Sequence, residues 1–367
     1  MSYRFKAKLS SEWVLEKASG AVLPLSEILR LLDAIDATGN ITGACKACNI
    51  SYRHAWGILR NAEREFEAAL IETSRRRGSK LTTFGQQLIW ANRRVDARLT
   101  PTLESMASEL QEELERLYPQ AQRRLSLHAS HGFAVEGLMQ LANDQGMLPI
   151  ELRYRTANEA LAGLNKGDCD VAGFQVPLGE FEPYFLERYL TWLNPKKHRL
   201  INLATRNTGL FVQADNPKNI QSVADLIKPD VRFVNRQSGS STRRLMGFML
   251  AKLGIPVGQI HGYDSVEFTH MAVAAHIASG MADTGIGVET AAWRFGLGFI
   301  PLAQERYFLA IRHEAVNTVA MQGFMELMAS TEYQAYVSQL VGYDASNVGK
   351  VQTLQEAFPS IATFPTS

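Results

Sequence analysis

Apolar residues in the second two-thirds of the chain follow two alternating patterns. Short apolar runs of strand length are each followed by a segment with apolar residues three or four positions apart, the spacing of an amphipathic helix. This alternation predicts an α/β domain with a mainly parallel sheet covered by helices, which binds ligands beyond the carboxyl ends of its strands. The strand-like runs are LSLHAS (125–130), IELRYRT (150–156), CDVAGFQVP (169–177), VRFVNRQ (231–237), ADTGIG (282–287) and FIPLAQERYFLAI (299–311).

The first third of the chain carries a helical pattern interrupted by a tight turn. SEILRLLDAIDA (26–37) has helical apolar spacing, with Ser26 as its predicted N-cap. A short helix is expected over residues 42–48, followed by a turn at Asn49, which tolerates positive φ, and a second helix capped by Ser51. Two packed helices that never meet DNA would show the same pattern, but it is typical of a helix-turn-helix. The residues expected to face inward are Ala44, Ala55, Trp56 and Leu59.

A second DNA-binding feature follows directly. LIETSRRRGSKLTTFGQQLI (70–89) predicts a strand, a basic turn, a strand and a helix that starts at a capping box of Thr83 and Gln86. The basic turn is a candidate β-wing whose cations would contact phosphates, and a solvated loop is the alternative. The residues expected to face DNA are Ser51, Tyr52, Arg53, His54 and Arg60 on the second helix, and Arg75, Arg76, Arg77 and Lys80 on the wing.

One long helical pattern with a narrow apolar stripe runs from residue 86 to residue 117. A stripe this narrow is typical of a coiled-coil-like seam, and a second copy of the chain is its simplest partner. We therefore expect a homodimer, the alternative being a helix packed against its own domain. The stripe consists of Leu99, Leu103, Met106, Leu110, Leu114 and Leu117.

Composition adds a local charge imbalance. The chain has 367 residues and a net charge of +1, and this length predicts two or three domains. Residues 46–98, however, hold 11 Lys and Arg against 5 Asp and Glu, which favours a polyanionic partner at that segment. No apolar run is long enough to cross a bilayer, and the N-terminal residues lack a signal-peptide pattern. We expect a cytoplasmic protein without membrane contact.

The sequence offers little support for catalysis, a metal site or a cofactor. CKAC (45–48) has the spacing of a zinc or redox pair, but it falls inside a predicted helix and is interpreted as core packing. His261, His270 and His276 are too dispersed to predict a metal site. Neither a GxSxG motif nor a phosphate-binding P-loop is present. We expect no enzymatic activity, no metal and no cofactor.

Three segments are expected to meet at a ligand cleft. HASHGF (128–133) and RQSGSSTR (236–243) each lead from a strand into a helix, and GFQV (173–176) belongs to a third strand. Hydroxyls and free N–H groups at helix starts bind anions, although Ser and Thr also cap helices that bind nothing. The candidate ligand residues are Ser130, His131, Gln175, Arg236, Gln237, Ser238, Gly239, Ser240, Ser241, Thr242 and Arg243.

The N-terminal motifs carry a family resemblance. ITGACKACNISYRHAWGILRNAE and SRRRGSKLTTFGQQLI resemble the winged helix-turn-helix of ModE and LysR transcription regulators, with ISYRHAW and LTTFGQQL closest to the ModE branch. The resemblance covers residues 20–117, and the short arginine-rich wing departs from the glycine-rich ModE pattern. It implies a dimer, or a tetramer, on double-stranded operator DNA.

The later segments resemble a different part of such regulators. RFVNRQSGSSTR and MAVAAHIASGMADTGIGVETAA are similar to the two-lobed, type II periplasmic-binding-protein-like (PBP-like) domain. The implied organisation is an α-rich winged helix-turn-helix domain (1–85), a linker helix (86–118) and a PBP-like α/β domain with two crossings between its lobes (122–367).

The resemblance implies a ligand-responsive regulator rather than an enzyme. By resemblance, the effector is molybdate, tungstate or a molybdenum-cofactor-related molecule, and the regulated genes concern molybdoenzymes such as formate dehydrogenase, or oxyanion uptake. The alternatives are a LysR-like sensor of a small organic acid such as formate, and an enzyme of cofactor assembly.

Overall fold

The computed structural model describes residues 7–18, 20, 22–74, 78–116, 124–146 and 149–360. The chain falls into two compact units, one formed by Ser10–Leu99 and the other by Thr100–Ser367 with Met1–Leu9. Within the described residues, every helix is too short or too polar to span a membrane.

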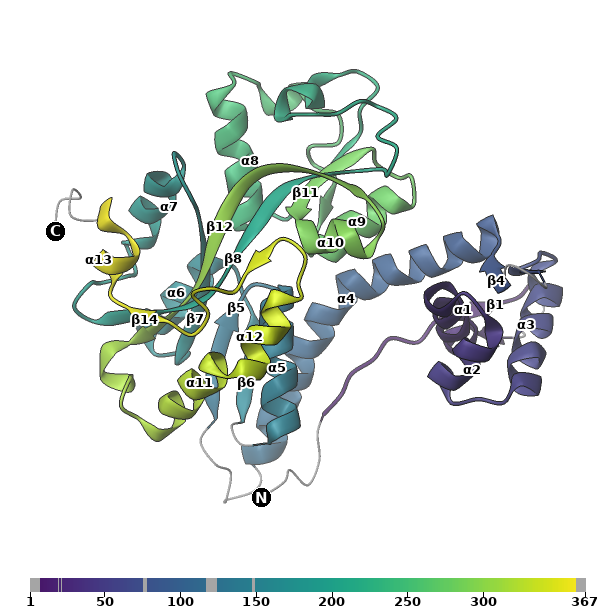
Figure 1. Cartoon of the computed structure of the whole chain (residues 1–367), viewed down its shortest axis with the longest axis horizontal. Helices are drawn as coiled ribbons and strands as arrows, with labels where there is room; N and C mark the ends of the chain where they lie inside the picture. Colours follow the sequence, from purple (N-terminus) through teal and green to yellow (C-terminus); the bar gives the residue numbers. More distant parts are fainter. Residues whose placement is uncertain are drawn as a thin grey trace. The chain divides into compact units, whose positions relative to one another are not determined.

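The first unit is a helix-turn-helix with a two-stranded wing (Figure 1). Asn49 lies in the left-handed region at φ 54°, as the turn requires, and the Ser51 hydroxyl accepts the His54 N–H at 3.2 Å. Ala44, Ala55 and Leu59 are fully buried, as predicted, and Trp56 is half-buried against the same core. The elements are β1 (Val14–Glu16), β2 (Val22–Pro24), α1 (Ser26–Thr38), α2 (Ile41–Cys48), α3 (Tyr52–Phe66), β3 (Ile71–Ser74) and β4 (Gly78–Leu81).

Two predicted caps are wrong by one residue. Ser26 is the first residue of α1, and Leu25 occupies the N-cap without a side-chain hydrogen bond. The helix α4 (Thr83–Arg116) begins after Thr82, whose hydroxyl accepts the Gly85 N–H at 3.1 Å. A one-residue shift leaves the apolar spacing unchanged, and at α4 the adjacent hydroxyls of Thr82 and Thr83 made the cap ambiguous as well.

The second unit is built on a ten-stranded mixed sheet with the order β10-β9-β11-β8-β12-β7-β5-β6, and β13 and β14 also pair with β8. The prediction of a mainly parallel sheet is wrong, because the sheet contains both parallel and antiparallel strand pairs. Two strands of 15 residues each, β8 (His198–Val212) and β12 (Gly298–Arg312), run antiparallel to each other through the middle of the sheet. Each pairs antiparallel with a further strand, β8 with β11 and β12 with β7. The other strands are β5 (Leu125–Ala129), β6 (Ile150–Tyr154), β7 (Val171–Pro177), β9 (Phe233–Arg236), β10 (Val266–Glu267), β11 (Thr284–Val288), β13 (Tyr343–Asp344) and β14 (Val351–Gln352).

Strands β8 and β12 are the two crossings between lobes. Lobe one holds β5, β6 and β7, and lobe two holds β9, β10 and β11; the parallel pairs β5–β6, β5–β7, β9–β10 and β9–β11 lie within the lobes. Helices cover the sheet in both lobes (Figure 1). They are α5 (Phe133–Gln145), α6 (Ala157–Lys166), α7 (Glu182–Tyr189), α8 (Ser241–Lys252), α9 (His270–Ala278), α10 (Glu289–Arg294), α11 (Val319–Ala329), α12 (Thr331–Ser338) and α13 (Leu354–Ala357), with short 3₁₀ turns at Val223–Ile227, Val257–Gln259 and His313–Ala315.

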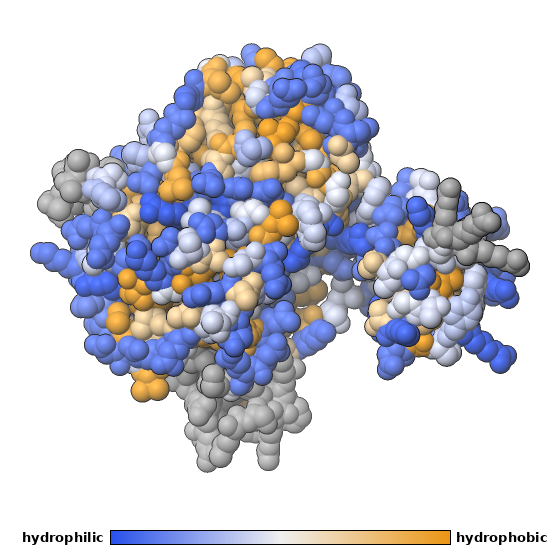
Figure 2. Space-filling view, in the orientation of Figure 1, coloured by the Kyte–Doolittle hydropathy of each residue, from blue (hydrophilic) through white to orange (hydrophobic). Residues whose placement is uncertain are grey.

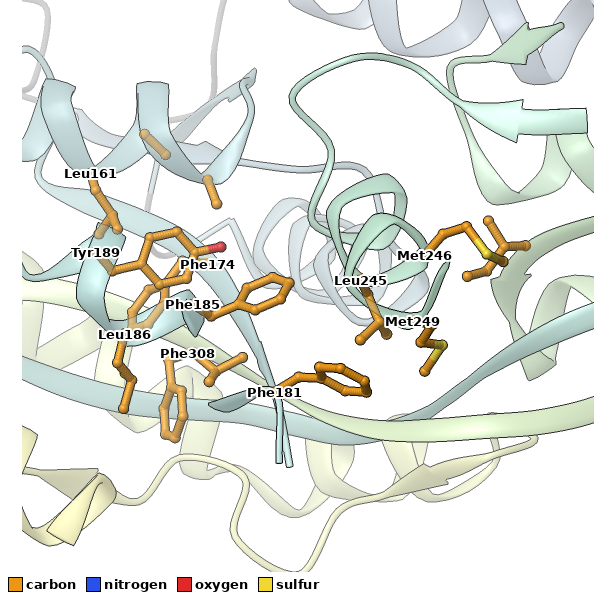
Figure 3. Close-up of a cluster of buried hydrophobic side chains, with 14 of the residues drawn as sticks. Leu161, Phe174, Phe181, Phe185, Leu186, Tyr189, Leu245, Met246, Met249 and Phe308 are labelled. Carbon is orange, nitrogen blue, oxygen red and sulfur yellow. The ribbon is translucent and has the colours of Figure 1, made fainter. Parts of the chain in front are cut away.

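A continuous apolar cluster joins the lobes. Phe181 and Phe185 lie between Tyr189 and the α8 side chains Leu245 and Met249 (Figure 3). Burying each of these aromatic rings contributes roughly 1.5–3 kcal/mol, so α7 and α8 are held firmly against the sheet. In Figure 2, apolar residues also reach the surface of the lobe that holds α8, whereas the visible face of the helix-turn-helix unit is mostly hydrophilic.

Candidate anion site and DNA-binding face

The N-terminal half of α3 presents a polar surface to solvent. Ser51, Tyr52, Arg53 and His54 are all exposed, with Tyr52 at 55%. Arg60, also exposed, lies over the Trp56 ring at 5.6 Å from its centroid, which restricts its guanidinium to one side of the helix. The surface has the donors needed for base edges and phosphates, and its contact with DNA remains a prediction.

The wing strands are anchored to the turn between α1 and α2. The Ser79 N–H donates to the Gly39 carbonyl at 2.9 Å, and Gly78, at φ 76°, packs so closely on that carbonyl that a Cβ would collide with it. Lys80 is exposed on β4. The predicted phosphate contacts Arg75, Arg76 and Arg77 lie outside the described residues.

The apolar stripe of α4 is largely exposed. Leu99, Met106, Leu110 and Leu114 are 38–51% exposed, Leu103 is half-buried, and Leu117 lies outside the described residues. An exposed row of large apolar side chains on one helix favours a protein partner. The homodimer therefore stays a prediction that this row supports.

The cysteine pair belongs to the core of the first unit. Cys45 is buried, and burial raises the pKa of its thiol. Cys48 is half-buried, with its Sγ 3.7 Å from the Arg30 carbonyl oxygen. Among the residues that the structure describes, no cluster of His, Cys, Asp or Glu could hold a metal ion.

The three segments predicted to form the ligand cleft do converge. Gln175 on β7 is 1% exposed and bridges the lobes: its Nε2 donates to Ser130 Oγ at 2.6 Å, and its Oε1 accepts from Ser241 Oγ at 3.0 Å. The Tyr307 hydroxyl on β12 donates to the Ser130 carbonyl at 3.0 Å and lies 3.2 Å from Ser130 Oγ. These bonds fix Ser130 and the start of α8 at one place between the lobes.

The loop before α8 is partly structural. Ser240 caps the helix by accepting the Arg243 N–H at 3.1 Å, so its hydroxyl is an ordinary N-cap. Gly239 has φ 86°, which favours glycine, and its position would bring a Cβ to 3.2 Å from Thr156 of lobe one. Ser238 and Gly239 are exposed, Gln237 is half-buried, and Thr242 is buried at 2% exposure.

The two arginines of this segment differ in their environments. The Arg243 guanidinium donates to the Arg236 carbonyl at 3.2 Å, approaches the exposed Asp264 at 3.5 Å and lies over Tyr263. Arg236 is buried at 4% exposure; its Nη2 donates to the Phe268 carbonyl at 2.8 Å, while Nε and Nη1 have no partner. Burial, and then the neighbouring Arg206, lower the pKa of Arg236 to about 9, so it remains charged at neutral pH. Of these two arginines, Arg236 is therefore the one with N–H groups left to bind an anion.

Sequence reasoning missed a second buried arginine at this place. Arg206 on β8 is 2% exposed and forms an ion pair with Glu305 of β12 at 2.6 Å. Its Nη1 has no hydrogen-bond partner and lies where a Cβ on Gly132, the N-cap of α5, would be 3.2 Å away. Tyr343 lies beside it, with its hydroxyl close enough to the guanidinium to interact with it. A lone arginine inside the apolar run LINLATRNTGLFV was the available signal.

Two histidines border the same region. His131 is held by Glu136, with Nε2 2.7 Å from the carboxylate, and its ring packs near Tyr154. His270, the first residue of α9, is 3% exposed, and its Nδ1 has no partner. Burial, followed by Arg236 and Arg206, lowers the pKa of His270 well below its usual value, so the ring is neutral.

The site therefore combines unpaired buried donors with helix N-termini. Unpaired buried N–H groups are costly and mark a place that favours an acceptor. The helices α5, α8 and α9 start beside Gly132, Ser240 and Thr269, and their dipoles add positive potential. We find no paired nucleophile and base among the site residues named here, and the arrangement suits binding of a small anion.

Family models match a segment in each of the two units. Residues 138–329 match the PBP superfamily domain, and residues 27–86 match the bacterial regulatory helix-turn-helix protein, lysR family. The uncharacterised protein YvgK of Bacillus subtilis (strain 168) is 34% identical to this chain over 202 residues. The match covers 54% of this chain and 64% of YvgK, so the chain spans less than two-thirds of that relative's length. An uncharacterised protein in the ferredoxin 2Fe-2S gene 5′ region of Clostridium pasteurianum is 38% identical over 102 residues, 28% of this chain and 90% of that protein. Among solved structures, a hydrogen-peroxide-bound OxyR mutant of Corynebacterium glutamicum matches with a TM-score of 0.44 and 16% identity, covering 84% of this chain and 92% of that one.

Proposed function

The chain belongs to the PBP superfamily and carries a lysR-family helix-turn-helix, and we propose that it is a LysR-type transcription regulator. A small oxyanion bound between Arg206 and Arg236 would control its binding to operator DNA. The observation that carries the proposal is a pair of buried guanidiniums with unpartnered nitrogens, which are Nη1 of Arg206 and Nε and Nη1 of Arg236. Regulators of this type are not enzymes, so the site's task is recognition rather than chemistry.

For the anion itself, molybdate or tungstate is the first candidate. The similarity of ISYRHAW and LTTFGQQL to the ModE branch points to it. A tetrahedral oxyanion presents acceptors on every side, and the site offers donors from several directions: guanidinium nitrogens of both arginines, the Ser130 hydroxyl and the N-termini of α5 and α8. The regulated genes would then concern molybdoenzymes or oxyanion uptake.

A small organic acid such as formate is the second candidate. Nε and Nη1 of Arg236 lie on either side of Nη2, so a carboxylate would take one of these unpartnered N–H groups together with the second hydrogen of Nη2. The two candidates differ in what they need. A carboxylate would depend on Arg236 alone, whereas an oxyanion would also need Ser130 and Arg206.

Regulation would follow from a shift between two domain states. An anion that contacts both lobes favours the closed state, because only that state lets both sets of donors reach it. If α4 joins two chains through its exposed stripe, closure would alter the spacing of the paired α3 helices on two operator half-sites.

A thermal-shift panel on the full chain tests the proposal. The anions are molybdate, tungstate, sulfate and formate, and an anion at about 100 times its dissociation constant stabilises the chain by roughly 2.7 kcal/mol. Arg236→Gln should abolish the shift, and the control Arg232→Gln, at an exposed arginine paired with Asp283, should keep it. If no anion shifts the unfolding temperature, the proposed function is wrong.

Ser130→Ala separates the two candidates. For an oxyanion the loss of this hydroxyl should weaken binding by about 1–3 kcal/mol, because a desolvated oxygen loses a donor. For formate held by Arg236 the same change should have little effect.

A further inference from the structure

His270 occupies an unusual position for a histidine. It opens α9, where the helix dipole disfavours an imidazolium, and it is almost fully buried with no partner for Nδ1. Gly287 on β11 lies against Nδ1, so a Cβ there would be 3.1 Å from it. Core packing alone would be served as well by an apolar side chain, since buried polar atoms normally have partners.

The charges around His270 come from several elements. Arg236 on β9, Arg206 on β8 and His131 in the loop between β5 and α5 all act on it, and each opposes its protonation. The nearby carboxylates are engaged elsewhere: Glu305 pairs with Arg206, and Glu267 pairs with His276 at 3.0 Å. Arg236 also donates to the Phe268 carbonyl, two residues before His270, so its guanidinium lies beside the start of α9, where a bound anion would offset its charge.

We propose that the effector is a doubly charged oxyanion and that its binding is coupled to the protonation of His270. This inference rests on the proposed function, because it needs an anion at the Arg206–Arg236 site. Because Glu305 already offsets the charge of Arg206, a dianion there would offset Arg236 and leave a second negative charge, and an oxygen, for Nδ1. With its own hydrogen on Nε2, the imidazole would take one proton from the solvent at Nδ1 and donate it as a hydrogen bond to that oxygen.

The sign of the pH dependence follows from linkage. Protonation of His270 is suppressed in the free protein and favoured in the complex, so the anion should bind more tightly as the pH falls between the two pKa values of this group. The limiting slope is about a tenfold gain in affinity per pH unit for one proton. A monoanion would be balanced by Arg236 alone, leaving no negative charge for an imidazolium, so its binding should take up less proton.

Calorimetry on the full chain measures this proton directly. Sodium molybdate, tungstate and sulfate would be titrated from about pH 6 to about pH 8 in bis-Tris and in imidazole buffers, whose ionisation enthalpies differ. The difference in heat gives the protons taken up per anion bound. We expect uptake that approaches one proton and is lost in His270→Gln, with affinity in that variant independent of pH.

Two variants identify the source of the proton. His261→Gln, at an exposed histidine of lobe two, is the control and should keep the full uptake, whereas His131→Gln reports on the other histidine that borders the site. Uptake that disappears in His131→Gln but persists in His270→Gln would overturn the inference. So would tight binding to the wild-type chain without any proton uptake, while leaving the proposed anion site intact.

An imidazole NMR titration keeps the test independent of the variant's folding. In the wild-type chain, one buried histidine should be neutral near pH 6.5 and become charged when molybdate is added. A histidine spectrum unchanged by saturating molybdate would refute the coupling. Absence of binding by all the anions would instead refute the proposed function itself.

Discussion

Within the effector domain, the free energy of unfolding should be most sensitive to substitution at the ion pair between Arg206 and Glu305. The two residues are 2% and 1% exposed, and Nε and Nη2 lie 2.7 and 2.6 Å from the same carboxylate oxygen. Arg206→Met removes one partner and leaves the Glu305 charge buried without compensation. Breaking such a pair costs about 3–5 kcal/mol, much of it from the abandoned charge rather than from the lost attraction.

The double variant Arg206→Met/Glu305→Met separates these contributions. Apolar residues of similar volume often replace a buried ion pair with little loss, so the double variant should recover most of the free energy of unfolding. Because Arg206 Nη1 is gone, it should still fail to bind an anion. Stability and anion binding would thus be affected independently.

Urea unfolding of the full chain provides the assay. Arg206→Met should lower the midpoint strongly, and Arg232→Met should change the free energy of unfolding by less than about 1 kcal/mol, because Arg232 is 44% exposed in its pair with Asp283. The reasoning is refuted if Arg206→Met costs no more than Arg232→Met, or if the double variant is less stable than the single one.

Three further predictions concern DNA, assembly and acid stability. Arg53→Ala on α3 should reduce the discrimination between operator and unrelated DNA by about 1–3 kcal/mol in anisotropy titrations, if it reads a guanine; equal loss on both DNAs would make it a phosphate contact. Leu110→Glu in the α4 stripe should produce monomers in sedimentation, because it places a charge in an apolar seam; an unchanged mass would move the interface elsewhere. Burial, Arg236 and Arg206 lower the pKa of His270 in the folded chain, which then binds fewer protons than the unfolded chain. Its stability should therefore fall below about pH 6.5, with a slope approaching 1.4 kcal/mol per pH unit for this group, and the pH dependence in His270→Gln should be shallower by that amount.

Most of the secondary structure could be predicted because local patterns determine it. The turn at Asn49, the cap at Ser51 and the helix at the end of the VRFVNRQ run depend on neighbours in the sequence, and all three are found. The long strands β8 and β12 are different. Their antiparallel pairing joins residues about a hundred positions apart, and buried strands of this kind lack the alternating pattern that marks direction.

Only some residues of the proposed binding site could be predicted from the sequence in this way. Ser130, Gln175 and Ser241 lie at strand ends and helix starts, so topology alone predicts that they meet. Arg206 and His270 needed the structure, because nothing local distinguishes an arginine with a buried, unpaired nitrogen from one that reaches solvent. Arg206 lies on the crossing strand β8 and His270 opens α9, so their placement near the site depends on the tertiary packing of two elements that are distant in the sequence.

A crystal of the full chain grown with tungstate would test the central claim most directly, since this anion gives a strong anomalous signal. The account predicts one peak between the lobes, with oxygens about 2.7–3.2 Å from Arg206 Nη1 and from Arg236 Nε or Nη1. A well-ordered structure grown in saturating tungstate with no peak at these nitrogens, or with its peak only on the surface, would contradict it.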